Sequence, residues 1–236
     1  MKAKYLIVNA DDFGASPGVN RGILEAHSRG IVTSASLMVD AADGEEAARM
    51  GRTAPWLGLG LHVDLHAHIT NGHEAGDRGA NEHGSLQLEL TRQIGRFVEL
   101  VGRPPSHIDS HRDVHRDPCL LPAFLELARR WNVPLRGHSP VRCLPEFYGQ
   151  WAGESHPEQL GVESLARILE RGVGEGFTEL ICHPGYCDGT LVSSYARERE
   201  VEVATLSDPR TRRVLLDLGI RLVNHGAVRS PEGSQL

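Results

Sequence analysis

The sequence alternates short apolar runs with segments of helical periodicity about seven times. No internal repeat and no linker-like segment interrupts this alternation. Alternating strands and helices are typical of a parallel sheet with helices outside it. We therefore expect one α/β domain over residues 1–236, with a (β/α) barrel-like fold of about seven parallel strands, because such barrels of roughly 200–250 residues commonly form a single domain.

The individual elements follow from periodicity and from the Gly and Pro residues that bound them. We expect strands at 5–8, 32–39, 57–61, 106–111, 133–136, 177–182 and 220–223, and helices at 17–30, 45–52, 88–101, 118–131, 162–173, 195–205 and 210–218. The segments 66–84 and 137–161 are polar and rich in Gly or Pro. We interpret both as long loops, which in compact domains are often functional.

Polar side chains recur where the expected strands end. In a closed barrel these ends converge on one mouth, whereas in an open sheet only the strands near the switch point would meet. The pattern therefore favours a closed barrel of seven or eight strands with a site at its mouth. The residues concerned are Asp11, Asp12, His62, Asp109, His111, Arg136, His183 and His225.

Composition excludes several classes of partner. The net charge is −6 and no basic tract is present, which argues against nucleic acid. No apolar run approaches the roughly 20 residues needed to span a bilayer, and none resembles a signal peptide. The four cysteines form no Cys-x-x-Cys pair, so we expect a cytoplasmic protein with reduced thiols. The oligomeric state stays open, with a homodimer as one option.

The thirteen histidines suggest metal chemistry, and three strand ends supply a plausible ligand set. Asp12, His62 and His111 offer one carboxylate and two imidazoles, which suit zinc and also iron, manganese, nickel or cobalt. Asp11, adjacent to Asp12, would then be held near the attacking water as a general base. The Gly-rich segments do not match a phosphate loop. The sequence also has no Gly-x-Ser-x-Gly elbow, which argues against a serine hydrolase.

Five segments resemble one family in the same order along nearly the whole chain. They are similar to motifs of the YdjC-like carbohydrate deacetylases, the chito-oligosaccharide deacetylase family. The first and fourth segments are the most specific. The segments are Leu6-Ile7-Val8-Asn9-Ala10-Asp11-Asp12-Phe13-Gly14, Gly30-Ile31-Val32-Thr33-Ser34, Gly60-Leu61-His62, Pro105-Ser106-His107-Ile108-Asp109-Ser110-His111 and Cys182-His183-Pro184-Gly185.

The resemblance implies a barrel-like fold, one divalent metal ion (magnesium or zinc), and hydrolysis of an N-acetyl group from a small N-acetylated sugar. Carried over by position, Asp12, His62 and His111 resemble the metal ligands and Asp11 resembles the base. His183 and Arg136 resemble further site residues. The two long segments 66–84 and 137–161 are then expected to border the sugar groove.

The remaining roles rest on this resemblance. His183 is the candidate that protonates the leaving amine, with His115 and His225 as competitors. Arg136 is expected to hydrogen-bond sugar hydroxyls or the oxyanion, with a rim salt bridge as the alternative. His115 is grouped with Arg136 as a substrate-binding candidate.

One motif departs from the family. Members often read His-His-His-Val-His or His-Gln-His-Val-His where this chain has His111-Arg112-Asp113-Val114-His115. Arg112 and Asp113 change the charge at the mouth, which leaves the sugar open. Two alternatives therefore stand: another metal-dependent amidohydrolase, suggested by the alternation of His62, Asp64, His66 and His68, and a non-catalytic sugar-binding barrel.

Overall fold

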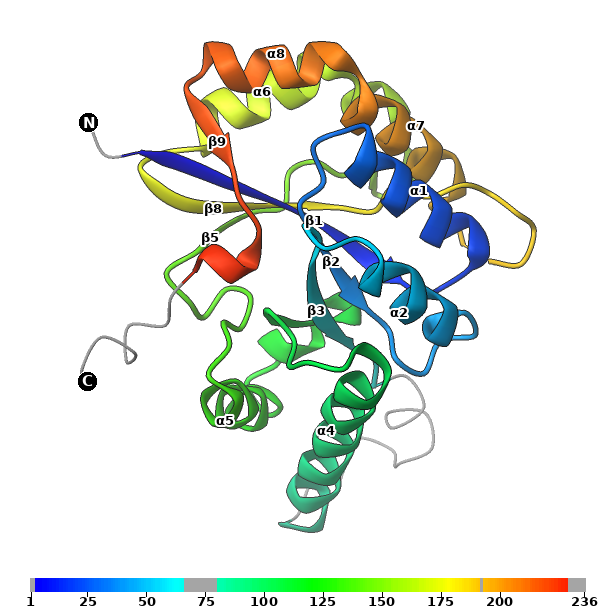
Figure 1. Ribbon diagram of the computed structural model, residues 1–236, viewed down its shortest axis with the longest axis vertical. Helices are drawn as coiled ribbons and strands as arrows, with labels where there is room; N and C mark the ends of the chain where they lie inside the picture. The colour runs from blue at the N-terminus through cyan, green and yellow to red at the C-terminus, as the bar shows by residue number, and fades with distance from the viewer. Residues whose placement is uncertain (1–2, 66–79, 192, 229–236) are drawn as a thin grey trace.

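In the computed structural model, which describes residues 3–65, 80–191 and 193–228, seven parallel strands form one curled sheet (Figure 1). The strand order is β4-β3-β2-β1-β8-β5, and β9 pairs with the first half of β1. This half-barrel confirms the expected (β/α) barrel-like fold. The strands are β1 (Lys4–Phe13), β2 (Ser34–Leu37), β3 (Gly58–Val63), β4 (Ile108–Ser110), β5 (Arg142–Leu144), β8 (Gly176–Cys182) and β9 (Ile220–Leu222).

Helices surround the sheet, with α1, α6, α7 and α8 at one end of the molecule and α2, α4 and α5 toward the other (Figure 1). No helix in the described ranges is long and apolar enough to cross a membrane. The helices are α1 (Pro17–Ser28), α2 (Gly44–Arg52), α4 (Ala80–Val101), α5 (Leu121–Trp131), α6 (Val162–Gly172), α7 (Ala196–Ser207) and α8 (Pro209–Asp217), with short 3-10 helices η1 (His111–Arg116), η2 (Pro157–Leu160) and η3 (His225–Ala227).

Strand β1 is the centre of the sheet. It pairs with β8 on one side, and on the other side with β9 and then β2. Its residues from Leu6 to Phe13 are all buried. Because both faces of a parallel strand are covered, such a strand reads as a nearly continuous apolar run. One cluster of buried apolar side chains extends from Leu6 to Ile220.

Two expectations about the strands and loops are wrong. Residues 133–136 do not form a ladder strand, since only Leu135 makes an isolated bridge to Ile108. Pro134 lacks an N–H and cannot donate to a ladder. The neighbour of β8 is instead β5, inside the segment expected to be a loop, which also holds the hairpin of β6 (Gln150–Trp151) and β7 (Glu154–Ser155).

The start of α4 and the closure of the sheet also differ from expectation. Helix α4 begins at Ala80, so the last residues of the expected loop 66–84 are helical, while residues 66–79 lie outside the described ranges. The sheet is curled, and no hydrogen-bonded pairing between its edge strands β4 and β5 is found among the described residues. The closed barrel expected from the sequence is therefore not formed by the described strands, and the mouth lies at the carboxyl ends of a half-barrel.

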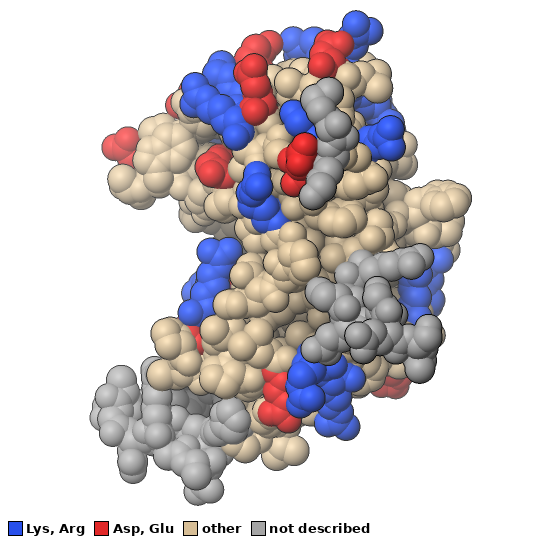
Figure 2. Space-filling view, turned by 90° about the vertical axis from the view of Figure 1, so that its left-hand side faces the viewer, with Lys and Arg blue, Asp and Glu red and all other residues tan. Residues whose placement is uncertain are grey.

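Exposed charges of opposite sign are interspersed on the face shown in Figure 2. Beside α6 and α8, Arg210 pairs with Asp208 at 2.8 Å and with Glu163 at 3.5 Å. Exposed ion pairs of this kind typically contribute less than about 1 kcal/mol each. The stability of the fold therefore depends on the buried core and the buried polar network.

Close packing beneath the sheet gives a test of this fold. A Cβ added at Gly60 would lie 2.2 Å from the ring of His107, which is buried and stacked on His225 with centroids 3.8 Å apart. We expect Gly60→Ala to lower the free energy of unfolding by roughly 3 kcal/mol because the stacked rings cannot move aside.

The matched control is Gly95→Ala, on the exposed side of α4, where a Cβ meets nothing within 4 Å. This change should raise the free energy of unfolding by roughly 0.5–1 kcal/mol, since Ala favours a helix over Gly. Urea unfolding of both variants measures the difference. Equal effects would contradict the packing described here.

Candidate active site

A β-bulge at the end of β1 turns two adjacent carboxylates toward one pocket. The register with β2 shifts between Ala10 and Phe13, and Asp12 has a left-handed backbone with φ 66°. In a regular strand, Asp11 and Asp12 would point to opposite faces of the sheet. The extra residue removes that alternation, so both side chains line a cavity of about 790 Å³.

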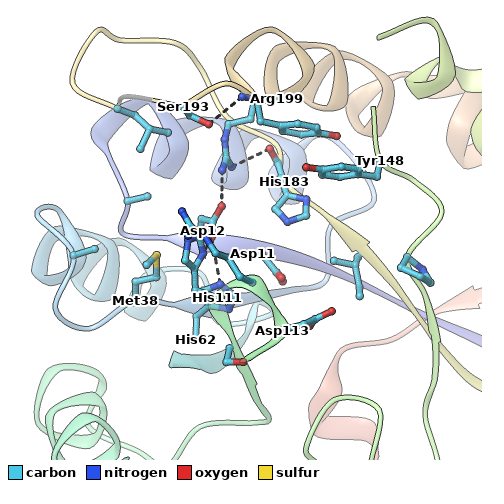
Figure 3. Close-up of a pocket in the computed structure, with 18 of the residues that line it drawn as sticks. Asp11, Asp12, Met38, His62, His111, Asp113, Tyr148, His183, Ser193 and Arg199 are labelled. Atoms are coloured by element: carbon cyan, nitrogen blue, oxygen red, sulfur yellow. Dashed lines mark hydrogen bonds and ion pairs between the residues drawn. The ribbon is translucent and has the colours of Figure 1, made fainter. Parts of the chain in front are cut away.

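Three side chains from the ends of separate strands converge in this pocket (Figure 3). Oδ1 of Asp12 lies 3.3 Å from Nε2 of His62 and 3.2 Å from Nδ1 of His111. One ligand atom from each lies within 4.8 Å of the others. His62 comes from β3, and His111 begins η1 directly after β4. The structure thus brings together the three residues predicted as metal ligands.

A carboxylate orients the ring of His62 by contacting the ring nitrogen that points away from Asp12. Nδ1 of His62 lies 2.7 Å from Oδ1 of Asp109, the residue that faces it on β4. This contact places one ring proton on Nδ1 and directs Nε2 toward Asp12, where a metal ion would take the place of the second ring proton. Burial lowers the pKa of His62, but Asp109, Asp12 and Asp11 outweigh it and raise the pKa well above its ordinary value.

Arg136 is buried beneath the pocket rather than exposed at its rim. Its guanidinium donates two hydrogen bonds of 2.7 Å to Asp11, and it also bonds Glu179 at 2.9 and 3.0 Å. The same group lies 2.7 Å from Asp109. The salt-bridge alternative therefore describes Arg136 in part, although the bridge is buried and joins three carboxylates.

This guanidinium controls the charge of the carboxylates that it contacts. Burial raises the pKa of Asp11, but Arg136 outweighs it and holds the pKa well below its usual range. Burial likewise raises the pKa of Glu179, and Arg136 brings it down to about 2. Both groups are therefore ionised at neutral pH.

Arg199, from α7, is a site residue that sequence reasoning missed. Its guanidinium donates a 2.5 Å hydrogen bond to Oδ2 of Asp12 and a 3.2 Å bond to the carbonyl oxygen of His183 (Figure 3). Oδ1 of Asp12 is then the oxygen that faces the two histidines. A signal existed, because Arg199 and Glu202 share a helical face with the apolar Val203 and Leu206.

The buried charges around the pocket do not balance. Four buried carboxylates face two buried guanidiniums and the imidazolium of His62, whose raised pKa keeps it protonated when no metal is bound, which leaves one negative charge; the groups are Asp11, Asp12, Asp109 and Glu179 against Arg136, Arg199 and His62. Burial raises the pKa of Glu202 to about 8, which disfavours its charged form at neutral pH. Buried charges need partners. A divalent cation at Asp12, His62 and His111 would take the place of the His62 proton, and it would then match both the negative charge and the donor atoms.

His183 faces the same pocket from the end of β8. Its backbone N–H donates a 2.5 Å bond to Glu202, and its ring lies edge-on to Tyr148 and Tyr195 at centroid distances of 6.0 and 5.8 Å. Burial lowers the pKa of its imidazole; Asp11 and Asp12 oppose this effect, and Arg199 and Arg136 add to it. No partner is found for its Nδ1 among the described residues.

The structure does not bring the other two histidine candidates into the pocket. His115 has no exposed surface; its Nδ1 bonds Ser110 at 2.6 Å, and its ring packs against Phe124. His225 is buried and stacked on His107, with Nε2 3.6 Å from Oε1 of Glu179. The reason is that β9 pairs only with the first half of β1, so its carboxyl end stops short of the mouth.

Two of the remaining residues do reach the mouth. Arg112 and Asp113 line the pocket, and both have left-handed backbones, with φ 55° and 54°. Of the alternating set that suggested another metallohydrolase, His62 lines the pocket and Asp64 does not. His66 and His68 lie outside the described residues.

The fold and the pocket together define a (β/α) barrel-like protein with a candidate metal centre at the carboxyl ends of its strands. A family model described as YdjC-like protein matches residues 5–217. The chain is 36% identical over 250 aligned positions to a carbohydrate deacetylase of Geobacillus stearothermophilus, covering 94% of this chain and 97% of that one. It is also 36% identical to a chitooligosaccharide deacetylase of Serratia marcescens, covering 93% and 97%. The chain therefore belongs to the YdjC-like family of carbohydrate deacetylases.

Solved structures share this fold. A protein of Enterococcus faecalis V583, provisionally described as a cellobiose-phosphate cleavage protein, superposes with a TM-score of 0.79 at 30% identity, covering 94% of this chain and 98% of that one. A family 4 carbohydrate esterase from Streptomyces lividans, in complex with acetate, gives a TM-score of 0.59 at 13% identity over 98% of both chains. The second likeness concerns the fold alone.

The charge accounting predicts how the site responds to loss of Arg199. We expect Arg199→Met to lower the free energy of unfolding in chelator by roughly 3–5 kcal/mol, because Oδ2 of Asp12 is left buried without a cationic partner. The control is Arg29→Met, since Arg29 is 73% exposed and pairs with Glu25 at 2.8 Å. That change should alter the free energy of unfolding by less than about 1 kcal/mol. Urea titrations that give the same shift for both variants would contradict the role assigned to Arg199.

Proposed function

We propose that this protein hydrolyses the N-acetyl group of an amino sugar or short N-acetylated oligosaccharide with the help of one divalent metal ion. The observation that carries the proposal is the bulge that places Asp11 and Asp12 side by side with different partners. Asp12 faces two imidazoles, whereas Asp11 is held by a guanidinium. Asp12 is thus suited to bind a metal ion, and Asp11 is suited to accept a proton. The names of the Geobacillus and Serratia relatives support the substrate class.

Asp12, His62 and His111 would hold the ion. When bound, it would polarise the acetyl carbonyl and make the attacking water more acidic. Two imidazoles and one carboxylate suit zinc, iron or cobalt, whereas magnesium prefers an all-oxygen set. We therefore favour zinc or a similar transition metal over magnesium.

Asp11 is the proposed general base. Its Oδ1 accepts bonds from Asn9 at 2.8 Å and from Arg136 at 2.7 Å, while Oδ2 accepts one bond from Arg136. A carboxylate oxygen can accept two hydrogen bonds, so Oδ2 keeps room for the proton of a water molecule. Arg136 fixes the direction of this oxygen and keeps it ionised, and in this scheme it acts by positioning Asp11.

His183 is the proposed general acid. As the water oxygen bonds to the acetyl carbon, its proton passes to Oδ2 of Asp11. Cleavage of the C–N bond then requires a proton on the sugar nitrogen, and His183 is the histidine on the pocket wall formed by β8, Tyr148 and Arg199. A lowered pKa makes its imidazolium a stronger acid, although a smaller fraction is protonated at neutral pH. The products are acetate and the free amine.

Substituting the two aspartates separately tests this division of roles. Asp11→Asn keeps the shape of the side chain but cannot take a proton, so metal content and substrate affinity should stay near wild type while kcat falls roughly 10²–10⁴-fold. Asp12→Asn should lower metal affinity instead, and added metal should restore part of the activity. Acetate release and metal titration measure both variants.

Full turnover by Asp11→Asn would exclude Asp11 as the base. Wild-type protein that binds N-acetylated sugars and releases no acetate with any divalent metal would indicate the non-catalytic sugar-binding barrel. Both results would refute the proposed deacetylase mechanism.

A further inference from the structure

A carboxyl group of α7 fixes the main chain at His183, the proposed general acid. Strand β8 ends at Cys182, and the pair of Cys182 with Ala10 is the last one in the β1–β8 ladder. His183 therefore lies just beyond the hydrogen bonds of the sheet. Its backbone N–H donates a 2.5 Å bond to Oε2 of Glu202 instead. The position of His183 is thus set from α7.

Two more contacts from α7 reach the same segment. The guanidinium of Arg199 donates a 3.2 Å bond to the carbonyl oxygen of His183 (Figure 3). The backbone carbonyl of Arg199 accepts a 3.2 Å bond from the N–H of Gly185. Pro184, between them, has no N–H to donate. Every backbone N–H from residue 183 to residue 185 is therefore bonded to α7.

Glu202 also orients an aromatic ring beside the imidazole. Its Oε1 accepts a 2.8 Å bond from the hydroxyl of Tyr195, and this hydroxyl accepts a 2.8 Å bond from the backbone N–H of Gly149. The rings of Tyr195 and Tyr148 stack with centroids 4.6 Å apart, and both lie edge-on to the ring of His183. One carboxyl group thus connects the backbone of His183 with the aromatic wall against which its ring packs.

Glu202 itself is set back from the reacting centre. Its side chain has no exposed surface and does not line the pocket, so it cannot touch a bound sugar. Within the described part of the chain, Nδ1 of His183 has no hydrogen-bond partner. The direction of the imidazole therefore depends on its backbone and on the two tyrosine rings, and Glu202 bonds the first and one of the second.

We propose that Glu202 is a positioning residue that directs His183 toward the leaving nitrogen of the substrate. The inference rests on the proposed function, in which a proton passes from the His183 imidazolium to the sugar nitrogen as the C–N bond breaks. A general acid must lie within hydrogen-bond reach of the atom that it protonates, and a displacement of about 1 Å can cost about 10²-fold in rate. Loss of the Glu202 contacts should therefore lower kcat more than it changes KM.

Acetate release from the β-1,4-linked dimer of N-acetylglucosamine tests this role. Glu202→Met keeps the length of the side chain but removes both acceptor oxygens, and we expect kcat to fall about 10–100-fold with little change in KM. Glu202→Gln should restore most of the turnover, because its amide oxygen can accept the bond from His183 and its NH2 group can donate to the hydroxyl of Tyr195. The neutral amide is a close substitute, since burial raises the pKa of Glu202 to about 8.

The matched control is Glu198→Met, one turn earlier on the same helix. Glu198 is also buried, and its Oε1 accepts bonds from Ser155 and Gln150 of the β6–β7 hairpin. This change should lower the urea midpoint of unfolding, as Glu202→Met does, but leave kcat near wild type. Equal losses of kcat in the two variants would overturn the role assigned to Glu202.

A double-mutant cycle with His183→Ala distinguishes positioning from a general loss of structure. If Glu202 acts through His183, adding Glu202→Met to His183→Ala should lower kcat by less than about twofold. The effects of independent sites multiply in rate. The same loss in both backgrounds would therefore exclude a positioning role.

Nuclear Overhauser contacts test the positioning without any turnover. Contacts from the ring of His183 to the rings of Tyr148 and Tyr195 should be present in wild type, Glu202→Gln and Glu198→Met, and lost in Glu202→Met. Their retention in Glu202→Met would refute the inference. If wild type releases no acetate with any divalent metal but the contacts are lost in Glu202→Met alone, the positioning role stands and the proposed deacetylase function fails.

Discussion

The buried contact between Arg136 and three carboxylates is the interaction on which the site depends. Asp11 comes from β1, Asp109 from β4 and Glu179 from β8, so one guanidinium joins strands across the curled sheet. Each of these carboxylates would be costly to bury alone, and a buried pair that loses one partner is strongly destabilised. The same contact therefore holds the sheet ends together and keeps Asp11 ionised and aimed into the pocket.

The residues around Arg136 are linked to the candidate metal ligands through shared hydrogen-bond partners. Asp109 contacts both Arg136 and His62. It therefore orients His62, a candidate metal ligand, and also pairs with the guanidinium that holds Asp11. Arg199 does for Asp12 what Arg136 does for Asp11: it donates a hydrogen bond to Oδ2 of Asp12. Two guanidiniums thus orient the two aspartates, and the negative charge left over favours a cation between Asp12 and the two histidines.

Sequence reasoning predicted the fold and the convergence of Asp11, Asp12, His62, His111 and His183, because parallel strands bring their carboxyl ends to one edge regardless of loop detail. The same rule was wrong for His225, because β9 pairs only with residues 4–6 of β1 and ends before the mouth. Hydrophobic periodicity does not show how far a strand extends along its neighbour. Arg136 reached the site although its expected strand does not exist.

Other contributors were harder to find. Glu179 is buried in β8, and a charge in that position indicates a buried partner without identifying it. Arg199 reaches the pocket from a helix whose packing against the sheet depends on the whole tertiary structure. Strand-end reasoning alone does not include residues of either kind.

Anomalous X-ray scattering from crystals of the protein soaked with zinc tests the central claim most directly. The account predicts one strong peak at the zinc edge, within roughly 2–2.3 Å of Oδ1 of Asp12, Nε2 of His62 and Nδ1 of His111. The peak should be lost in His62→Ala crystals. A wild-type map with no peak at these atoms, or with the main peak elsewhere, would contradict the metal centre and the mechanism built on it.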